Sequence, residues 1–232
     1  MAPMVEPAAA ERVSGGRGVE RWAALGGILY VVLFIVGLIV AESGEPGGDA
    51  SPAKVIAYYS KSSHRDKIGI GWLISLIGFF GLVWFIAVLG HEVRRLSGED
   101  LLARVTVIGG TIYAALGLVG SSLGMAIRTM SDDTYQHRVY PELIHAASDA
   151  GYVIHSGGGV GIGAAMIAVS IAVLQARSLP AWVAWLGVVA GIASIFSIFF
   201  FPWIVIAVWL VVASVLLFVS AGRRAATSVL SR

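Results

Sequence analysis

Residues 178–222 read SLPAWVAWLGVVAGIASIFSIFFFPWIVIAVWLVVASVLLFVSAG and contain no Asp, Glu, Lys or Arg. One helix of these 45 residues would be about 68 Å long at 1.5 Å per residue, more than twice the ~30 Å hydrocarbon core of a bilayer. The block must therefore fold back on itself. Pro202 marks the place, because proline suits the first turn of a helix and breaks a helix interior. We expect two antiparallel spans here.

Four further uncharged runs precede this block, and each exceeds the roughly 18 residues at which a membrane span becomes a better interpretation than a buried core helix. The composition agrees, since 13% of the residues are charged, against about a quarter in soluble domains. The sequence therefore predicts an all-α integral membrane bundle of six transmembrane helices, the fourth helix starting near Pro141. The expected spans are residues 22–41, 68–90, 105–127, 152–175, 181–200 and 202–221.

The ends of the chain are polar, and the basic residues predict their side of the membrane. Residues 1–21 form a leader and residues 223–232 a tail, on either side of a transmembrane domain at 22–222. With six spans, ten Lys and Arg residues fall on the side of the termini and six on the opposite side. By the positive-inside rule, both termini are expected to be cytoplasmic.

The first outer connection, residues 42–67, carries the signals of a short helix. Ser51 is a suitable N-cap, and Pro52 a suitable first helical residue. Apolar side chains then follow at helical spacings, which predicts an amphipathic helix lying at the outer membrane surface. These side chains are Val55, Ile56, Tyr58 and Tyr59.

Small residues recur at steps of three and four along three predicted spans. Because lipid gives little hydrophobic drive between helices, such stripes favour close helix packing. We expect this packing within the chain, with a homodimer interface as the alternative. The three sets are Gly110, Ala114, Gly117, Ser121 and Gly124; Gly157, Gly161, Ala164 and Ala168; and Ala184, Gly187, Gly191 and Ser194.

One stretch carries a resemblance to a known family. The first outer connection reads Asp49-Ala-Ser-Pro-Ala-Lys-Val-Ile-Ala-Tyr-Tyr59, and His64-Arg65 follows before the second span. With six expected spans in 232 residues, this resembles a group of actinobacterial membrane proteins, the domain of unknown function 4386 family. The resemblance covers nearly the whole chain, and its specific part is the Ala-Tyr-Tyr…His-Arg stretch. It implies a six-helix fold in the plasma membrane, and it brings no established activity and no catalytic residues.

Histidines gather near the predicted outer face and supply the candidate site. On a helix through residues 141–156, His145 and Asp149 are one turn apart, and Tyr152 lies on the same side. A histidine and a carboxylate at this spacing can bind a metal together, or the carboxylate can orient the imidazole in a proton relay. We therefore name His145 and Asp149 as candidate metal ligands. Further candidates for a ligand or proton-relay site are Tyr152, His155, His64, Arg65 and Arg128.

Each of these candidates also has a simpler interpretation. His145 and Asp149 at a water interface are explained by a local hydrogen bond. His155 lies deeper, beside Gly157-Gly158-Gly159, where an ionisable group is costly and tends to be functional; a neutral imidazole bonded to a neighbouring helix is the alternative. Arg128 closes the third span, and either anchors it at the interface or holds an anionic headgroup.

Several classes of function are disfavoured. The predicted spans hold no Asp, Glu, Lys or Arg, which weighs against an ion-coupled pump. There is no cysteine, and the net charge of +2 is small, so neither thiolate metal sites nor nucleic-acid binding is expected. The main hypothesis is a non-enzymatic binder of a small apolar or amphipathic ligand, or of a partner membrane protein, with no cofactor. The alternatives are a haem- or divalent-metal-dependent enzyme or electron carrier using the outer histidines, and a passive transporter or channel.

Overall fold

A computed structural model shows an all-α chain and describes residues 18–129 and 138–230, with side chains as far as Arg223. Five of its helical segments are long and apolar enough to cross a membrane, so the chain is a multi-pass membrane protein. These segments are Gly18–Glu42, Ser62–Ser97, Asp100–Thr129, Pro141–Ala176 and Phe201–Arg223. The helices are α2 (Gly26–Glu42), α3 (Pro52–Tyr59), α4 (Ser62–Ser97), α5 (Asp100–Thr129), α6 (Pro141–Ala176), α7 (Ala181–Ser194) and α8 (Phe201–Leu230).

The prediction that residues 178–222 fold back at Pro202 is confirmed. The chain reverses between α7 and α8, and Pro202 is the second residue of α8. The count of six spans is not confirmed, because α7 has 14 residues. A helix of that length reaches about 21 Å, short of a ~30 Å hydrocarbon core. Turns at 195–200 complete the segment expected to be the fifth span.

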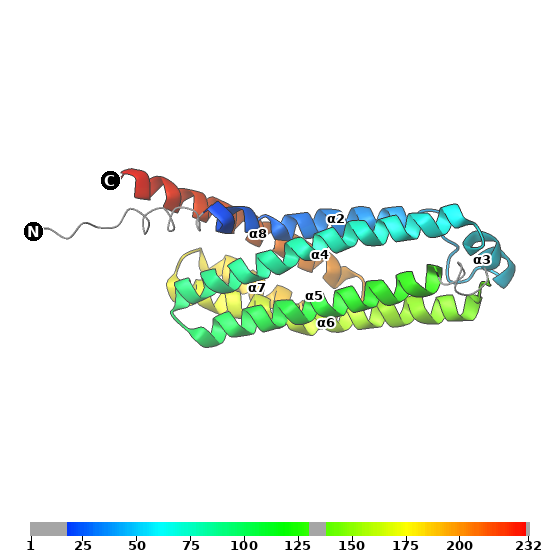
Figure 1. The fold of residues 1–232 in the computed structure, drawn as a ribbon. Coiled ribbons are helices and arrows are strands. Elements are labelled where there is room, and N and C mark those ends of the chain that lie inside the picture. The colour runs from blue at the N-terminus through cyan, green and yellow to red at the C-terminus, as the bar shows by residue number, and fades with distance from the viewer. Residues whose placement is uncertain (1–17, 130–137, 231–232) are drawn as a thin grey trace, which may run out of the picture.

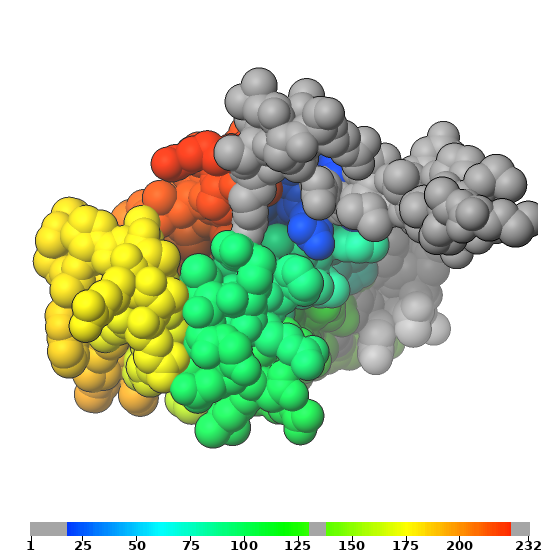
Figure 2. Space-filling view, turned by 90° about the vertical axis from the view of Figure 1, so that its left-hand side faces the viewer, coloured from blue at the N-terminus to red at the C-terminus, as the bar shows by residue number. Residues whose placement is uncertain are grey.

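The long helices lie side by side, with α2 packed along α4 and α5 along α6 (Figure 1). The C-terminal half of α8 returns to the start of the first helical segment, where the Arg21 guanidinium lies 4.4 Å above the Phe218 ring. The described helices therefore begin and end at one end of the bundle, and α3 lies at the other. Figure 2 shows the first of these ends, where the α4–α5 connection lies beside the α6–α7 connection.

Glycines determine how closely the helices approach. A Cβ on Gly109 would meet the carbonyl oxygen of Gly161, and one on Gly120 would meet that of Gly151, so α5 and α6 pack backbone to backbone. The stripe of α7 packs on α6 in the same way, through Gly191. The residues that bring α5 against α6, Gly109 and Gly120, lie beside the predicted stripe of α5 and not in it. Members of all three stripes still pack within the chain, since a Cβ on Gly110 would meet Ile86, one on Gly161 would meet Gly109, and one on Gly191 would meet Gly163. The homodimer alternative stays a prediction. Helix α6 continues through Gly157-Gly158-Gly159 without a break, so these three glycines do not interrupt it.

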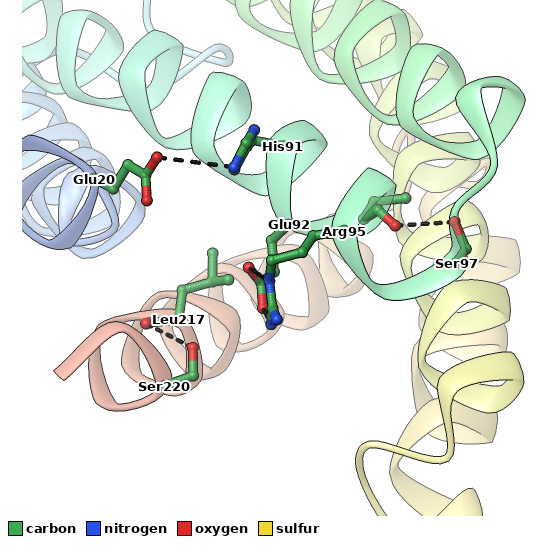
Figure 3. A network of polar contacts seen from close by, with 8 residues as sticks. Glu20, His91, Glu92, Arg95, Ser97, Leu217 and Ser220 are labelled. Atoms are coloured by element: carbon green, nitrogen blue, oxygen red, sulfur yellow. Dashed lines mark hydrogen bonds and ion pairs between the residues drawn. The ribbon is translucent and has the colours of Figure 1, made fainter. Parts of the chain in front are cut away.

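Polar side chains are also buried at the end where α2 starts and α8 ends (Figure 3). Glu92 is buried and accepts two hydrogen bonds from Arg95, at 2.9 and 2.5 Å, beside Leu217 of α8. His91 Nε2 lies 3.8 Å from a Glu20 carboxylate oxygen, which joins α4 to the first helical segment. The contact between His91 and Glu20 is thus the one drawn in Figure 3 that joins two helical segments, while the Glu92–Arg95 pair lies within α4.

The predicted short helix is present as α3, which begins at Pro52 after the N-cap Ser51. Its two buried residues, Val55 and Tyr59, cluster with Ile68 of α4 and Ile144 of α6. The apolar face of α3 is therefore covered by the helix bundle, while Ile56 stays exposed. In this way α3 closes the end of the bundle above α4 and α6.

Candidate functional site

A cavity of about 330 Å³ lies at the α3 end of the bundle. Its walls come from α2, α4, α5 and α6, and its floor from the connection between α7 and α8. A volume of this size is at the lower end of the range found for small-molecule sites.

The short α7–α8 hairpin creates the cavity. The rings of Phe34 and Trp203 are stacked with centroids 6.3 Å apart, and the Tyr152 hydroxyl donates a hydrogen bond to the Ile198 carbonyl at 2.8 Å. These contacts place the hairpin turn level with the middle of α2 and with a point about one third of the way along α6. Beyond them, α2 continues for about 12 Å to Glu42, and α6 extends for about 16 Å to Pro141. The described helices therefore leave space above the turn, flanked by α2 and α6.

The inner wall of the cavity is made by small residues of α4 and α5. Gly71, Ser75, Gly120 and Gly124 line it. Most of these glycines also pack against another helix, but a Cβ on Gly124 would meet nothing within 4 Å. Gly124 thus faces the open space, and a larger side chain there would occupy the cavity rather than part the helices.

Aromatic rings form the floor. Trp203 lies between Tyr152, with ring centroids 6.1 Å apart, and His155, at 4.2 Å. Phe34 completes the group, with its ring centroid 5.3 Å from that of His155. The deep part of the cavity is therefore an apolar, aromatic surface.

His155 is the buried polar residue of this floor. It is 6% exposed, and its Nε2 has no hydrogen-bond partner in the described part of the chain. That nitrogen faces α5, since it would lie 3.0 Å from a Cβ on Gly117. The Tyr113 ring lies 5.6 Å away, and its hydroxyl is hydrogen-bonded to that of Tyr30 at 3.0 Å. One interpretation of His155 is a neutral imidazole hydrogen-bonded to a neighbouring helix. The described residues provide no such hydrogen bond to its Nε2.

The rim of the cavity is charged. Arg128 donates a hydrogen bond from Nη2 to the Ser148 hydroxyl at 3.1 Å, which links α5 to α6. Its Nε lies 3.2 Å from Glu45 Oε1, close enough for an ion pair but not aligned for a hydrogen bond. Glu42 lines the rim from α2. The cavity is thus polar at its mouth and apolar at its base.

The Tyr-Tyr…His-Arg stretch forms a clasp that holds α3, which we define as Tyr58, Tyr59, His64 and Arg65. The His64 ring stacks on Tyr58 with centroids 4.0 Å apart, and its Nδ1 lies 2.9 Å from the Tyr58 carbonyl oxygen. Arg65 Nη1 donates to the Tyr59 carbonyl at 2.9 Å. His64 and Arg65 therefore fix the end of α3 instead of lining the cavity.

The clasp also reaches the rim of the cavity through Glu45. The Tyr59 hydroxyl donates a hydrogen bond to Glu45 Oε1, the oxygen that lies beside Arg128. Burial and this hydrogen bond raise the pKa of Tyr59 well above its ordinary value, so the phenol stays neutral and keeps its proton for Glu45. Burial raises the pKa of Tyr58 as well.

The structure brings three of the predicted site residues together, namely Arg128, Tyr152 and His155. His145 and Asp149 do not line the cavity, and the described residues contain no group of three His, Cys, Asp or Glu side chains able to hold a metal. No hydrogen bond joins His145 to Asp149 among these residues. His155 lies about 15 Å from His145 along the axis of α6. The metal site therefore stays a prediction.

Sequence reasoning missed Phe34, Ser148 and Trp203, which line the cavity, and Glu45, which lies beside Arg128 at its rim. Each is an ordinary residue type in its own segment, and none stands in a recognisable motif. Only Trp203, directly after the turn-forming Pro202, gave a signal, because it fixes an aromatic ring at the start of α8.

These features define a helical multi-pass membrane protein with a cavity at one end of the helix bundle. The rim of this cavity is polar, and its floor is aromatic. Residues 25–222 match the family described as Domain of unknown function (DUF4386), and the chain belongs to that family. No curated protein matches the chain, and no solved structure does.

Proposed function

We propose that this protein binds a small amphipathic molecule in the cavity at the α3 end of the bundle. We further propose that it lies in the plasma membrane with both termini cytoplasmic, as the ten-to-six distribution of basic residues favours. In that orientation the cavity belongs to the outer half of the membrane. The protein acts as a binder in this proposal, and no chemical step is assigned to it.

The change of polarity along the cavity carries the proposal. On α6, Ser148 at the rim and His155 at the floor are about 10 Å apart along the helix axis. Over this distance the lining passes from the charged side chain of Arg128 to the rings of Phe34 and Trp203. A ligand with a polar head and an apolar body matches this order, because binding sites combine apolar walls with a few placed polar groups.

The open flank of the cavity supports entry from the lipid. Large apolar side chains are exposed around the hairpin turn below it, and lipid is expected to solvate them. They are Ile195, Phe196, Ile198, Phe199, Phe200 and Phe201. A molecule already dissolved in the membrane can then slide between α2 and α6 without leaving the hydrocarbon region.

Fluorescence quenching tests the proposal. A dibrominated fatty acid added to the protein in an uncharged detergent is expected to quench a saturable part of the tryptophan emission, because Trp72 and Trp203 line the cavity. Gly124→Leu fills the open space and is expected to remove the saturable part. Gly69→Leu is the matched control, since Gly69 also has open space at its Cβ but does not line the cavity. Equal saturable quenching in both variants, or none in the wild type, would refute the proposal.

A further inference from the structure

We propose that Arg128 is the binding site for an anionic headgroup and that Glu45 occupies this site until the headgroup displaces it. This inference rests on the proposed function and narrows it to an amphiphile with one oxyanionic group, a phosphate or a carboxylate. It is argued from the geometry of the rim, where the Arg128 guanidinium and the Glu45 carboxylate lie 3.2 Å apart but do not form the bidentate pair of hydrogen bonds that is strongest for these groups.

Arg128 has unused capacity for an oxyanion. A guanidinium carries five N–H donors in a planar fork that matches a carboxylate or phosphate with two parallel hydrogen bonds. Among the described residues, the hydrogen bond of this group goes to the Ser148 hydroxyl, and its buried Nε has none. The side chain is 16% exposed, so water supplies little of what is missing. A phosphate entering the cavity would find the fork partly open.

Glu45 compensates the charge of Arg128 but is shared with another donor. The same carboxylate oxygen, Oε1, accepts the Tyr59 hydroxyl and lies 3.2 Å from Arg128 Nε. Glu45 is 13% exposed and belongs to the connection between α2 and α3, outside both helices. Its position can therefore change without unfolding a helix. If Glu45 moves away from Arg128, the hydrogen bond from the Tyr59 hydroxyl still holds the Glu45 carboxylate.

Glu42 is the second acidic group at the rim, and it gives the control. It lines the cavity from α2, and among the described residues it makes no ion pair with Arg128, whose carboxylate partner is Glu45. Replacing either glutamate by glutamine removes one negative charge from the rim. Only the Glu45 replacement removes the competitor for Arg128. A local displacement and a general electrostatic effect therefore predict different results for these two variants.

Competition against the brominated fatty acid tests the inference with two probes that share one chain, dodecyl phosphate and dodecanol. The wild type is expected to bind dodecyl phosphate at least about tenfold more tightly than dodecanol, the gain expected for hydrogen bonds to a charged group. Glu45→Gln should tighten dodecyl phosphate binding several-fold and leave dodecanol binding unchanged, whereas Glu42→Gln should change both little. Arg128→Gln should abolish the preference for the phosphate.

Equal changes in Glu45→Gln and Glu42→Gln, or an intact phosphate preference in a folded Arg128→Gln protein, would overturn the inference. If Arg128→Gln does not fold, the comparison of the two glutamate variants alone decides. Inorganic phosphate at the same concentration is expected not to compete. If it competed as strongly as dodecyl phosphate, the claim that Arg128 binds the headgroup of an amphiphile would be wrong, and the ligand would be a free oxyanion. Equal affinities for dodecyl phosphate and dodecanol would refute this inference alone. The absence of saturable binding for any amphiphile would refute the proposed function.

Discussion

At the scale of single residues, buried hydroxyl groups find partners in two ways, although those of Ser156 and Ser214 have none among the described residues. Ser75 and Ser170 donate to the carbonyl oxygens one turn earlier, at 3.0 and 2.8 Å, as expected for serines in membrane helices. Tyr30 and Tyr113 instead pair with each other from α2 and α5, next to the aromatic floor of the cavity. This hydrogen bond joins two helices, whereas each serine bond stays within one helix.

The tyrosine pair leads to a prediction about stability. Tyr113→Phe leaves the buried Tyr30 hydroxyl without its partner and is expected to lower the free energy of unfolding by about 1 kcal/mol. The double variant Tyr30→Phe/Tyr113→Phe should lose no more than the single variant, because neither polar group is then left unpaired. Equilibrium unfolding in mixed detergent micelles measures this, with the exposed Tyr140→Phe as a neutral control. Additive losses in the double variant would contradict the role given to the pair.

At the scale of elements, the attachment of α3 is the feature that links the family stretch to the cavity. Val55 and Tyr59 bury the apolar face of α3, the clasp fixes its end, and Glu45 joins it to Arg128. The Tyr-Tyr…His-Arg residues thus fix the position of α3, and the residues that line the cavity lie mainly on α2, α4, α5 and α6. His64 and Arg65, which the sequence offered as ligand or proton-relay candidates, contact the end of α3 in the structure.

The raised pKa of Tyr59 predicts that α3 detaches at high pH. The docked state favours the protonated phenol, so this stabilisation is complete below the ordinary tyrosine pKa of about 10 and is lost as the pH rises above it toward the raised value. The chain has no cysteine, so a single Val55→Cys variant reports on docking through its rate of thiol labelling. This rate, divided by that of the exposed Ala53→Cys, should rise above about pH 10.

Tyr59→Phe supplies the control for this titration. Phenylalanine cannot ionise, so in the Val55→Cys background it should remove the alkaline rise, at the cost of somewhat faster labelling at neutral pH. An unchanged rise in that double variant would assign the detachment to another group.

At the scale of the whole molecule, unequal helix lengths create the site. The α7–α8 hairpin ends level with Phe34 and Tyr152, while α2, α4, α5 and α6 continue toward α3. Small residues then allow the longer helices to pack closely on one side and leave their outer ends apart on the other. The cavity is a property of this mismatch, since no single helix contains it.

The proposed orientation predicts which connections face the outside of the cell. Gly47→Cys, between α2 and α3, should react with a membrane-impermeant thiol reagent in intact cells, and Glu99→Cys, between α4 and α5, should react only after the membrane is opened. The physical reason is the excess of basic residues on the side of the α4–α5 connection, which resists translocation. Labelling with the opposite pattern would invert the topology and place the cavity in the inner leaflet.

The sequence by itself determined the membrane class, the positions of the long helices, the reversal at Pro202 and the short helix after Ser51, because each follows from local signals. Long uncharged runs are solvated by lipid whatever their neighbours, and proline favours the first turn of a helix over its interior for purely local reasons. The sequence also singled out Arg128, Tyr152 and His155 among its candidates.

The tertiary structure alone decided what lies around those residues. It shortened the expected fifth span to α7, brought Phe34 and Trp203 against His155, and left His145 and Asp149 outside the cavity. The depth of a hairpin and the pairing of Arg128 with Glu45 depend on contacts between helices distant in the chain. Periodicity records which side of a helix is small or polar, but not which partner it meets or at what height, so these features could not be predicted from the sequence.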